Sequence, residues 1–316
     1  MFATLLGGLP EPDAIGDPVA IAIRAQEEAG LEPITDGRRI DPGFERLAAA
    51  LGAGVWMAPL TVDDWRRAST LTDRAVKQAL PGPYSLGRQL AGDVRPGGPG
   101  AGDDRARQTL AFADGLRREI EALAEAGCQL VEIEETDAHL IGADEGERRL
   151  FSEAHERLAE GAMGTHLSLS IVGGAAAGTG IETILTAPYA SLAVDLVDGP
   201  DNWNLVTRLA GDRGVVVGVL GASERGDHPT ELLLWAAHYA ASTGRRGVAR
   251  VGLGSAGSWA NLTWEAAVGR MQRLGDAARL ASMPPSEELL RSLQPAAISA
   301  RRAALGHDAP PRPRGQ

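Results

Sequence analysis

The stretch that decides the fold runs from residue 129 to residue 172 and reads "QLVEIEETDAHLIGADEGERRLFSEAHERLAEGAMGTHLSLSIV". Its first and last seven residues are short runs in which apolar and polar residues largely alternate, as is typical of strands. Between them, residues 145–161 have the spacing of a helix. A strand, a helix and a second strand in this order predict two parallel strands joined by a helix that packs on the sheet.

The same alternation extends through most of the chain. Further strands are predicted at residues 4–8, 31–37, 75–83, 192–197, 214–220 and 248–254. Further helices are predicted at residues 17–30, 44–54, 61–70, 105–127, 181–187, 201–211, 230–242 and 263–282. Eight strands, each followed by a helix, predict an α/β protein with a single (β/α)₈ TIM barrel. An open doubly wound sheet is the alternative, and the absence of a G-x-G-x-x-G motif after the first strand disfavours it. We expect one barrel domain over residues 1–303 and a disordered, proline-rich tail over residues 304–316.

Composition narrows the class of function. The chain has 316 residues, 44% of them hydrophobic, and a net charge of -11. This acidic balance disfavours nucleic acid as a partner. No apolar run reaches the roughly 20 residues that cross a bilayer, and the N-terminus lacks the basic segment of a signal peptide. We therefore expect a cytoplasmic protein without a membrane partner. The single cysteine, Cys128, excludes an internal disulfide and a cysteine-rich metal cluster.

Polar residues gather where the predicted strands end, and the active sites of such barrels lie at the C-terminal ends of the strands. The candidates, in chain order, are Asp36, Arg38, Tyr84, Ser85, Glu134, Glu135, His166, Ser168, Asp195, Ser223, His228 and Ser255. Burying such groups costs several kcal/mol unless they are paired. We therefore expect them to converge in a working site, with Glu134, Glu135 and His166 as its acid–base residues and the others lining it.

The order of several motifs resembles a known family. They are "GLEPITDGRR", "VKQALPGPYSL", "LAEAGCQLVEIEET", "THLSLS", "LAVDL" and "VARVGLGSAGSW". From Thr4 to about Ser282, the chain resembles the catalytic barrel of cobalamin-independent methionine synthase, whose superfamily includes uroporphyrinogen decarboxylase. The resemblance implies a barrel and a chemistry in which a methyl group passes from a folate to the thiolate of homocysteine, held by zinc.

The zinc site of that family is changed in this chain. The resemblance places His166 at the family's histidine ligand, Ser168 at its first cysteine, Asp195 at its glutamate and Ser255 near its second cysteine. Serine is a poor zinc ligand, because its hydroxyl would have to lose a proton. We therefore expect no bound zinc; if zinc is retained, its ligands would be His166 and Asp195.

Other changes concern the substrate. Arg38 stands where the family has a glutamate that faces the amino group of homocysteine, and this reversal of charge favours an anionic substrate. Asp36 remains able to accept an amine. Glu134 keeps a family acid with one methylene more. Ser223 falls at the family's general-acid histidine, for which His228 could substitute.

These observations predict a diverged barrel enzyme that transfers a methyl or alkyl group, or cleaves a related C–S or C–N bond, on a small anionic substrate. One alternative is a zinc-dependent methyltransferase acting on 5-methyltetrahydrofolate and homocysteine. The other is a non-catalytic barrel that binds a metabolite or a partner. The sequence does not indicate an oligomeric state.

Overall fold

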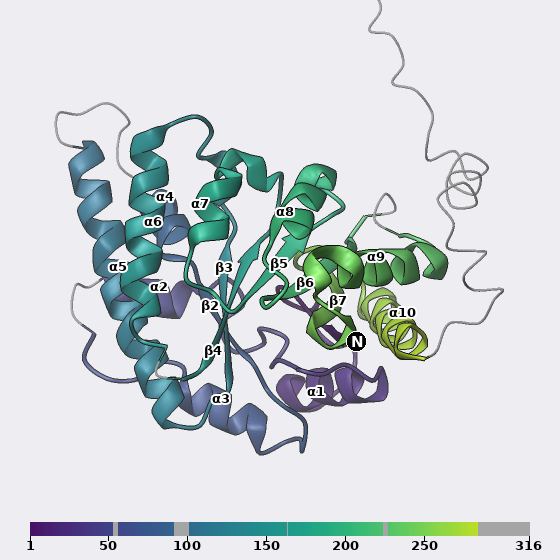
Figure 1. Cartoon of the computed structure of the whole chain (residues 1–316). Coiled ribbons are helices and arrows are strands. Elements are labelled where there is room, and N and C mark those ends of the chain that lie inside the picture. Colours follow the sequence, from purple (N-terminus) through teal and green to yellow (C-terminus); the bar gives the residue numbers. More distant parts are fainter. Residues whose placement is uncertain (53–55, 92–100, 163, 224–226, 284–316) are drawn as a thin grey trace, which may run out of the picture.

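A parallel β-sheet forms the centre of the computed structural model, which describes residues 1–52, 56–91, 101–162, 164–223 and 227–283. The sheet has seven strands in the order β1-β7-β6-β5-β4-β3-β2, and every pair of neighbours is parallel. The strands are β1 (Phe2–Thr4), β2 (Gln78–Pro81), β3 (Leu130–Glu135), β4 (His166–Ile171), β5 (Ser191–Asp195), β6 (Gly214–Leu220) and β7 (Val251–Ser255). Figure 1 shows this curled sheet with helices around it. The predicted α/β fold with a parallel sheet is therefore confirmed. The tail predicted at residues 304–316 lies outside the described residues.

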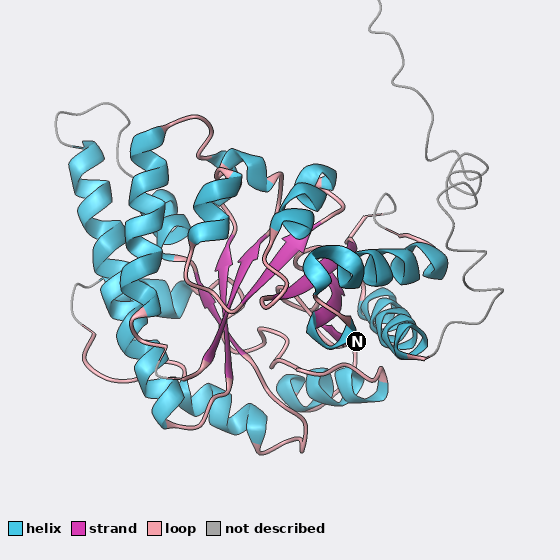
Figure 2. Cartoon of the chain, viewed as in Figure 1, coloured by secondary structure: helices cyan, strands magenta, loops and turns pink. Residues whose placement is uncertain are grey.

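The helices that follow the strands cover the outside of the sheet, as Figure 2 shows. They are α1 (Pro18–Glu28), α2 (Glu45–Gly52), α3 (Val62–Ser69), α4 (Pro83–Ala91), α5 (Ala101–Glu125), α6 (Glu145–Ala159), α7 (Ile181–Thr186), α8 (Trp203–Arg208), α9 (Thr230–Ser242) and α10 (Trp264–Ser282). Asp17 caps α1 by accepting a hydrogen bond from the amide of Val19 at 3.0 Å, and Pro18 occupies the first turn, where its missing N–H costs nothing. None of the helices in the described ranges is long and apolar enough to cross a bilayer.

One of the eight predicted strands, residues 31–37, is not formed as a regular strand, so the sheet has seven strands where a (β/α)₈ barrel would have eight. Its segment makes one isolated parallel bridge, from Ile34 to Val76. Pro33 has no N–H to give to a ladder. The side-chain amide of Gln26 donates to the carbonyl of Thr35 at 2.8 Å and accepts from its N–H at 3.0 Å, so the groups that a neighbouring strand would use are already satisfied. The segment still reaches both edges of the sheet, because Glu32 donates to Ala3 in β1 and Ile34 donates to Ala75 ahead of β2.

The two faces of the sheet bury different kinds of residue. The outer face contributes to the main hydrophobic core, in which residues such as Val131, Ile133 and Leu169 pack with the helices. The inner face carries only a small apolar cluster of Leu6, Val172, Ala193 and Val216, with Phe2 packed against it. Polar side chains occupy much of the remaining inner face, and they are described next.

Away from the sheet, a buried arginine joins the ends of α8 and α9. The guanidinium of Arg246 donates to the carbonyls of Leu209 and Ala240, both at 3.0 Å, and Nη2 reaches Val206 at 3.4 Å. Its Nε donates to the carbonyl of Arg213 at 3.0 Å. Arg246 therefore satisfies carbonyls at helix ends that would otherwise be buried without donors.

Candidate functional site

Strand alternation separates two neighbouring glutamates at the end of β3. Successive residues of a strand point to opposite faces, so Glu134 lies on the inner face with Glu132, and Glu135 lies on the outer face. Both carboxylates are buried, Glu134 at 3% exposure and Glu135 at 0%. Their surroundings differ, and this difference separates candidate function from structure.

Glu135 is fully engaged by α4 and α6. Its carboxylate accepts the amides of Tyr84 at 3.0 Å and Ser85 at 2.8 Å, which are free N–H groups in the first turn of α4. The hydroxyl of Ser85 also donates to it, and the ring of His155 lies 3.0 Å away. Gly82 must lack a side chain, because a Cβ there would lie 2.0 Å from this carboxylate. Glu135 therefore anchors the start of α4.

Tyr84 and Ser85 belong to the same anchor. The hydroxyl of Tyr84 donates to Glu147 of α6 at 2.6 Å, while burial and that carboxylate raise the pKa of Tyr84 to about 12. The hydroxyl of Ser85 accepts the amide of Asp137 at 2.9 Å. We had expected these residues to line the mouth of the barrel, but their contacts hold α4 to β3 and α6. No helix was predicted at residues 83–91.

At the C-terminal ends of the strands, the inner face carries five polar residues that we call the C-terminal cluster: Asp36, Arg38, Glu134, Ser170 and Asp195. The guanidinium of Arg38 forms an ion pair with Glu134, and it also lies 4.2 Å from the centre of the Phe44 ring. Glu134 and Ser170 face each other in the β3–β4 register. Arg38 therefore joins the segment after residue 35 to Glu134 of β3, beside Ser170 of β4, and Asp195 ends the next strand, β5.

Several buried atoms of the C-terminal cluster have no hydrogen-bond partner. They are Nε of Arg38, Oε1 of Glu134 and Oγ of Ser170. Leaving such atoms unsatisfied costs about 1–3 kcal/mol each, and more for charged groups. Two donors and an acceptor in one buried place suit a polar ligand better than they suit a closed core.

The backbone around Arg38 is held in an uncommon conformation. Arg38 has a φ of 54°, a region that non-glycine residues adopt with strain. The carboxylate of Asp36 accepts the amide of Arg38 at 2.9 Å and thereby fixes the turn. Burial lowers the pKa of Arg38 to about 10 against the raising effects of Glu132, Asp36 and Asp41, so its guanidinium stays charged at neutral pH. Burial raises the pKa of Asp36.

Asp195 ends β5 with its carboxylate fully buried. It accepts the amides of Val197 at 2.8 Å and Asp198 at 3.0 Å, and more weakly that of Gly173 at 3.4 Å. Burial raises its pKa, and these backbone donors oppose the shift. A buried acid with a raised pKa is better able to donate a proton near neutral pH than an exposed one.

His166 lies at the opposite end of the sheet, contrary to our expectation. It is the first residue of β4, and Ile171, the last residue of that strand, pairs with Val194, so that the next position, 172, is level with Asp195. Six residues at about 3.3 Å each separate the two levels by roughly 20 Å. His166 therefore does not meet Glu134 or Asp195. The two proposed zinc ligands cannot bind the same ion, and the residues present do not fit the family's zinc site.

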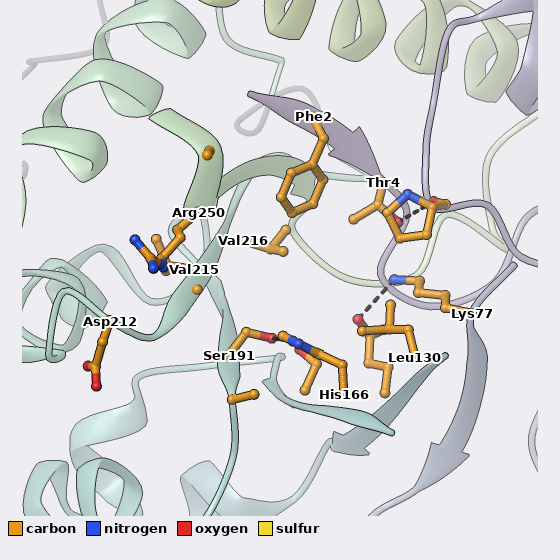
Figure 3. Close-up of a pocket in the computed structure, with 16 residues that line it drawn as sticks. Phe2, Thr4, Lys77, Leu130, His166, Ser191, Asp212, Val215, Val216 and Arg250 are labelled. Carbon is orange, nitrogen blue, oxygen red and sulfur yellow. Dashed lines mark hydrogen bonds and ion pairs between the residues drawn. The ribbon is translucent and has the colours of Figure 1, made fainter. Parts of the chain in front are cut away.

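The N-terminal ends of the strands line a separate, partly open cavity of about 400 Å³, which we call the N-terminal cavity. Polar groups from Thr4, Lys77, Glu132, His166, Ser168 and Ser191 line it, together with Phe2, Leu130, Val215 and Val216 (Figure 3). The Nζ of Lys77 lies 2.9 Å from Glu132, and both side chains are buried. Ser168 therefore lies with His166 in this cavity and not at the C-terminal cluster.

The remaining predicted residues have other places. The hydroxyl of Ser255 accepts from the amide of Leu6 at 2.7 Å and donates to its carbonyl at 2.9 Å, which joins the chain after β1 to β7. Ser223 is exposed. The backbone carbonyl of His228 accepts a hydrogen bond from Arg273 of α10. None of these contacts brings the three residues to the C-terminal cluster.

One candidate was missed in the sequence. His139 follows β3 in the turn Ala138–Leu140, and its ring packs under the loop after β4, where a Cβ on Gly174 would meet it at 2.7 Å. Its buried Nδ1 has no hydrogen-bond partner. The signal was the position of the residue, four places after the end of a strand whose last residues are acidic.

Within the ranges that the structure describes, no three His, Cys, Asp or Glu side chains come together as metal ligands would. No family model matches the chain, and no curated protein matches its sequence. Solved structures do match its fold. A B12-independent methionine synthase from Shewanella sp. W3-18-1, in complex with selenomethionine, matches with a TM-score of 0.73 at 14% identity, over 92% of this chain and 98% of that one. A methyltransferase from Methanosarcina mazei matches with a TM-score of 0.61 at 13% identity, over 88% of this chain and 94% of that one. At these identities the likeness concerns the fold.

Proposed function

We propose that the chain is a barrel enzyme whose reaction takes place at the C-terminal cluster, on a small substrate that carries an acidic group. The observation that carries the proposal is the set of unpartnered buried atoms on Arg38, Glu134 and Ser170. The position supports it as well, because barrel enzymes react at the C-terminal ends of their strands.

Charge in the cluster narrows the substrate further. Arg38 is the cation of the cluster, and Asp36, Glu134 and Asp195 are its acids. An acidic group on the substrate would use the unpartnered Nε of Arg38, because guanidinium donors bind carboxylates and sulfonates well. The same substrate also needs a hydrogen-bond donor that reaches Glu134 or Ser170. An anion without such a donor would be repelled by the carboxylates of the cluster, which outnumber its cation.

We infer that the reaction is the transfer of a methyl or alkyl group, or the cleavage of a related C–S or C–N bond. The likeness in fold to a methionine synthase and a methyltransferase supports this class. Glu134 would accept the proton of the nucleophile, and Asp195, whose pKa burial raises, would donate one to the leaving group. Glu135 and His166 have no part in this proposal, because one lies on the outer face and the other at the far end of the sheet.

Matched thiols test the substrate class. We expect 2-mercaptoethanesulfonate to bind the full chain at least tenfold more tightly than 2-mercaptoethanol, as measured by calorimetry. Arg38→Gln should remove this preference. Arg46→Gln should leave it intact, because Arg46 is half-exposed and pairs with Asp64 at the surface. Equal affinities for the two thiols, or a preference that survives Arg38→Gln, would overturn the proposal. Arg39 is unsuitable as the control, because its buried guanidinium holds the carbonyls of Leu9 and Gly37.

Turnover separates the alternatives. Each thiol, and homocysteine, would be incubated with methyl donors, 5-methyltetrahydrofolate among them, and the products identified by mass spectrometry. Methylation of homocysteine that a chelator abolishes would favour the zinc-dependent alternative. Binding without turnover of any pair would favour the non-catalytic barrel.

A further inference from the structure

The N-terminal cavity is built like a binding site, although it lies at the end of the sheet away from the proposed reaction. Leu130, His166, Ser191 and Gly214 line it, and each is the first residue of its strand. Its volume of about 400 Å³ lies within the range of about 300–1,000 Å³ that small-molecule pockets occupy. The first residues of separate strands thus contribute to one pocket that is open at its rim.

The strongest indication of a ligand is an unsatisfied acid in the wall. Glu132 is 2% exposed, and its Oε2 pairs with Lys77 while its Oε1 has no hydrogen-bond partner. The Nζ of Lys77 donates to Oε2 of Glu132 and to the carbonyl of Leu5 at 2.5 Å, and it makes no hydrogen bond to Oε1. The wall therefore offers a buried carboxylate oxygen that lacks a donor.

The other ionisable groups that line the cavity do not supply a donor to Oε1 of Glu132. The ring of His166 lies 2.8 Å from the hydroxyl of Ser191, and partial burial lowers the pKa of His166, which favours its neutral form. Arg250 and Asp212 also line the cavity, but both side chains are exposed, and Figure 3 shows them apart from Lys77, the partner of Glu132. An anion would thus find no free cation inside the cavity, whereas a cationic donor would complete Glu132.

The rest of the wall suits an apolar body. The ring of Phe2 and the side chain of Val216 face the cavity in Figure 3. Gly252 makes room for this ring, since a Cβ there would lie 2.4 Å from it. We propose that the N-terminal cavity binds a small primary amine with an apolar, preferably aromatic, body, its ammonium group bound by Oε1 of Glu132.

Three probes of one shape test the class of ligand: benzylamine, benzyl alcohol and benzoate, each titrated into the full chain and followed by amide chemical shifts. We expect benzylamine to bind at least tenfold more tightly than the other two. Glu132→Gln should reduce this preference to less than threefold. Equal binding of benzyl alcohol would overturn the assignment of an amine, and failure of benzylamine to bind at millimolar concentration would overturn the site.

Two variants at the rim test whether benzylamine binds in the N-terminal cavity, and neither changes the hydrophobic core. Ala249 lines the cavity, and its neighbour Val248 does not; both are exposed. Ala249→Trp should block the cavity and weaken benzylamine at least tenfold, while Val248→Trp should leave its affinity unchanged. Benzylamine affinity that survives Ala249→Trp, or that falls with Glu134→Gln, would overturn the placement. This inference does not depend on the proposed function, because its residues do not overlap with the C-terminal cluster.

Discussion

Glu134 and Glu135 are neighbours in the chain, yet their carboxylates lie in two regions that differ in how many hydrogen-bond partners they supply. On the outer face, Glu135 receives two backbone amides and one hydroxyl, and His155 contacts it as well. On the inner face, Glu134 has Arg38 as its ion-pair partner and keeps one oxygen without a hydrogen bond. A buried polar group that is fully satisfied contributes to one folded arrangement, whereas an incompletely satisfied one weakens the fold unless a ligand completes it.

The comparison extends beyond these two residues. Arg246, away from the sheet, has carbonyl partners at both of its terminal nitrogens and at Nε. Arg38, on the inner face, has a buried Nε without a partner. Two buried arginines in one chain thus show the same contrast as the two glutamates. We therefore propose that Glu135 and Arg246 serve the fold and that Glu134 and Arg38 serve the proposed site.

The largest expected effect is on stability, from Arg246→Met. This change keeps the length of the side chain and removes its donors, so that buried carbonyls of Val206, Leu209 and Ala240 lose their partners. We expect the free energy of unfolding to fall by about 3–5 kcal/mol, since each buried orphan costs about 1–3 kcal/mol. Urea denaturation measures it. A loss below ~1 kcal/mol would mean that the hydrogen bonds of Arg246 contribute little to the stability of the fold. The structural role that the comparison gives to Arg246 would then be wrong.

The fold was largely predictable, because it depends on local periodicity. The strand–helix–strand pattern of residues 129–172 reappears as β3, α6 and β4. Helix α4 was missed because its anchor is not local: the carboxylate that accepts its first amides comes from Glu135, some 50 residues later. The segment 31–37 reads as a strand, but Gln26 occupies the backbone groups of Thr35.

The site was less predictable than the fold. The alternation of β4 indicated that His166, Ser168 and Ser170 share one face of the sheet. It did not show where the strand begins, and the start of the strand decides at which end of the sheet His166 lies. The separation of Glu134 from Glu135 was predictable from the sequence, because adjacent residues of a strand face opposite sides of the sheet. The pairing of Arg38 with Glu134 joins residues nearly a hundred positions apart, and no local pattern encodes such a contact.

A smaller effect is expected when the inner pair is removed as a whole. In Arg38→Met/Glu134→Met, two incompletely satisfied charges give way to apolar groups of similar size. Such replacements are often neutral or stabilising, so we expect the free energy of unfolding to change by less than about 1 kcal/mol, while the preference for 2-mercaptoethanesulfonate disappears. Urea denaturation and calorimetry on one preparation check both. A destabilisation above ~2 kcal/mol would show that the pair serves the fold.

The smallest effect concerns Asp195 and depends on pH. Burial raises the pKa of Asp195 in the folded state, so between its unfolded value near 3.8 and that raised value the folded state binds more protons than the unfolded state. The contribution of this group to stability is therefore full below pH ~3.8 and falls as the pH rises through the folded pKa.

Asp195→Asn lacks this dependence. Relative to the wild type, its free energy of unfolding should improve by up to about 1 kcal/mol between pH 4 and pH 7, as measured by urea titrations at each pH. If the free energy of unfolding of the variant instead falls relative to the wild type as the pH rises, the backbone donors stabilise the charged carboxylate of Asp195. Asp195 would then resemble Glu135, whose donors serve the fold.

The most direct test measures the free energies of unfolding of Glu134→Gln and Glu135→Gln side by side in urea at neutral pH. Both changes keep the shape of the side chain and remove one carboxylate oxygen as an acceptor. Glu135→Gln should lose about 2–4 kcal/mol, because an amide nitrogen then faces the buried donors of α4. Glu134→Gln should stay within ~1 kcal/mol of the wild type, because its remaining oxygen still accepts from Arg38 and because Glu132, Asp36 and Asp41 still favour the charge of Arg38. Equal losses in the two variants, or a larger loss in Glu134→Gln, would contradict the division between a structural outer face and a functional inner face.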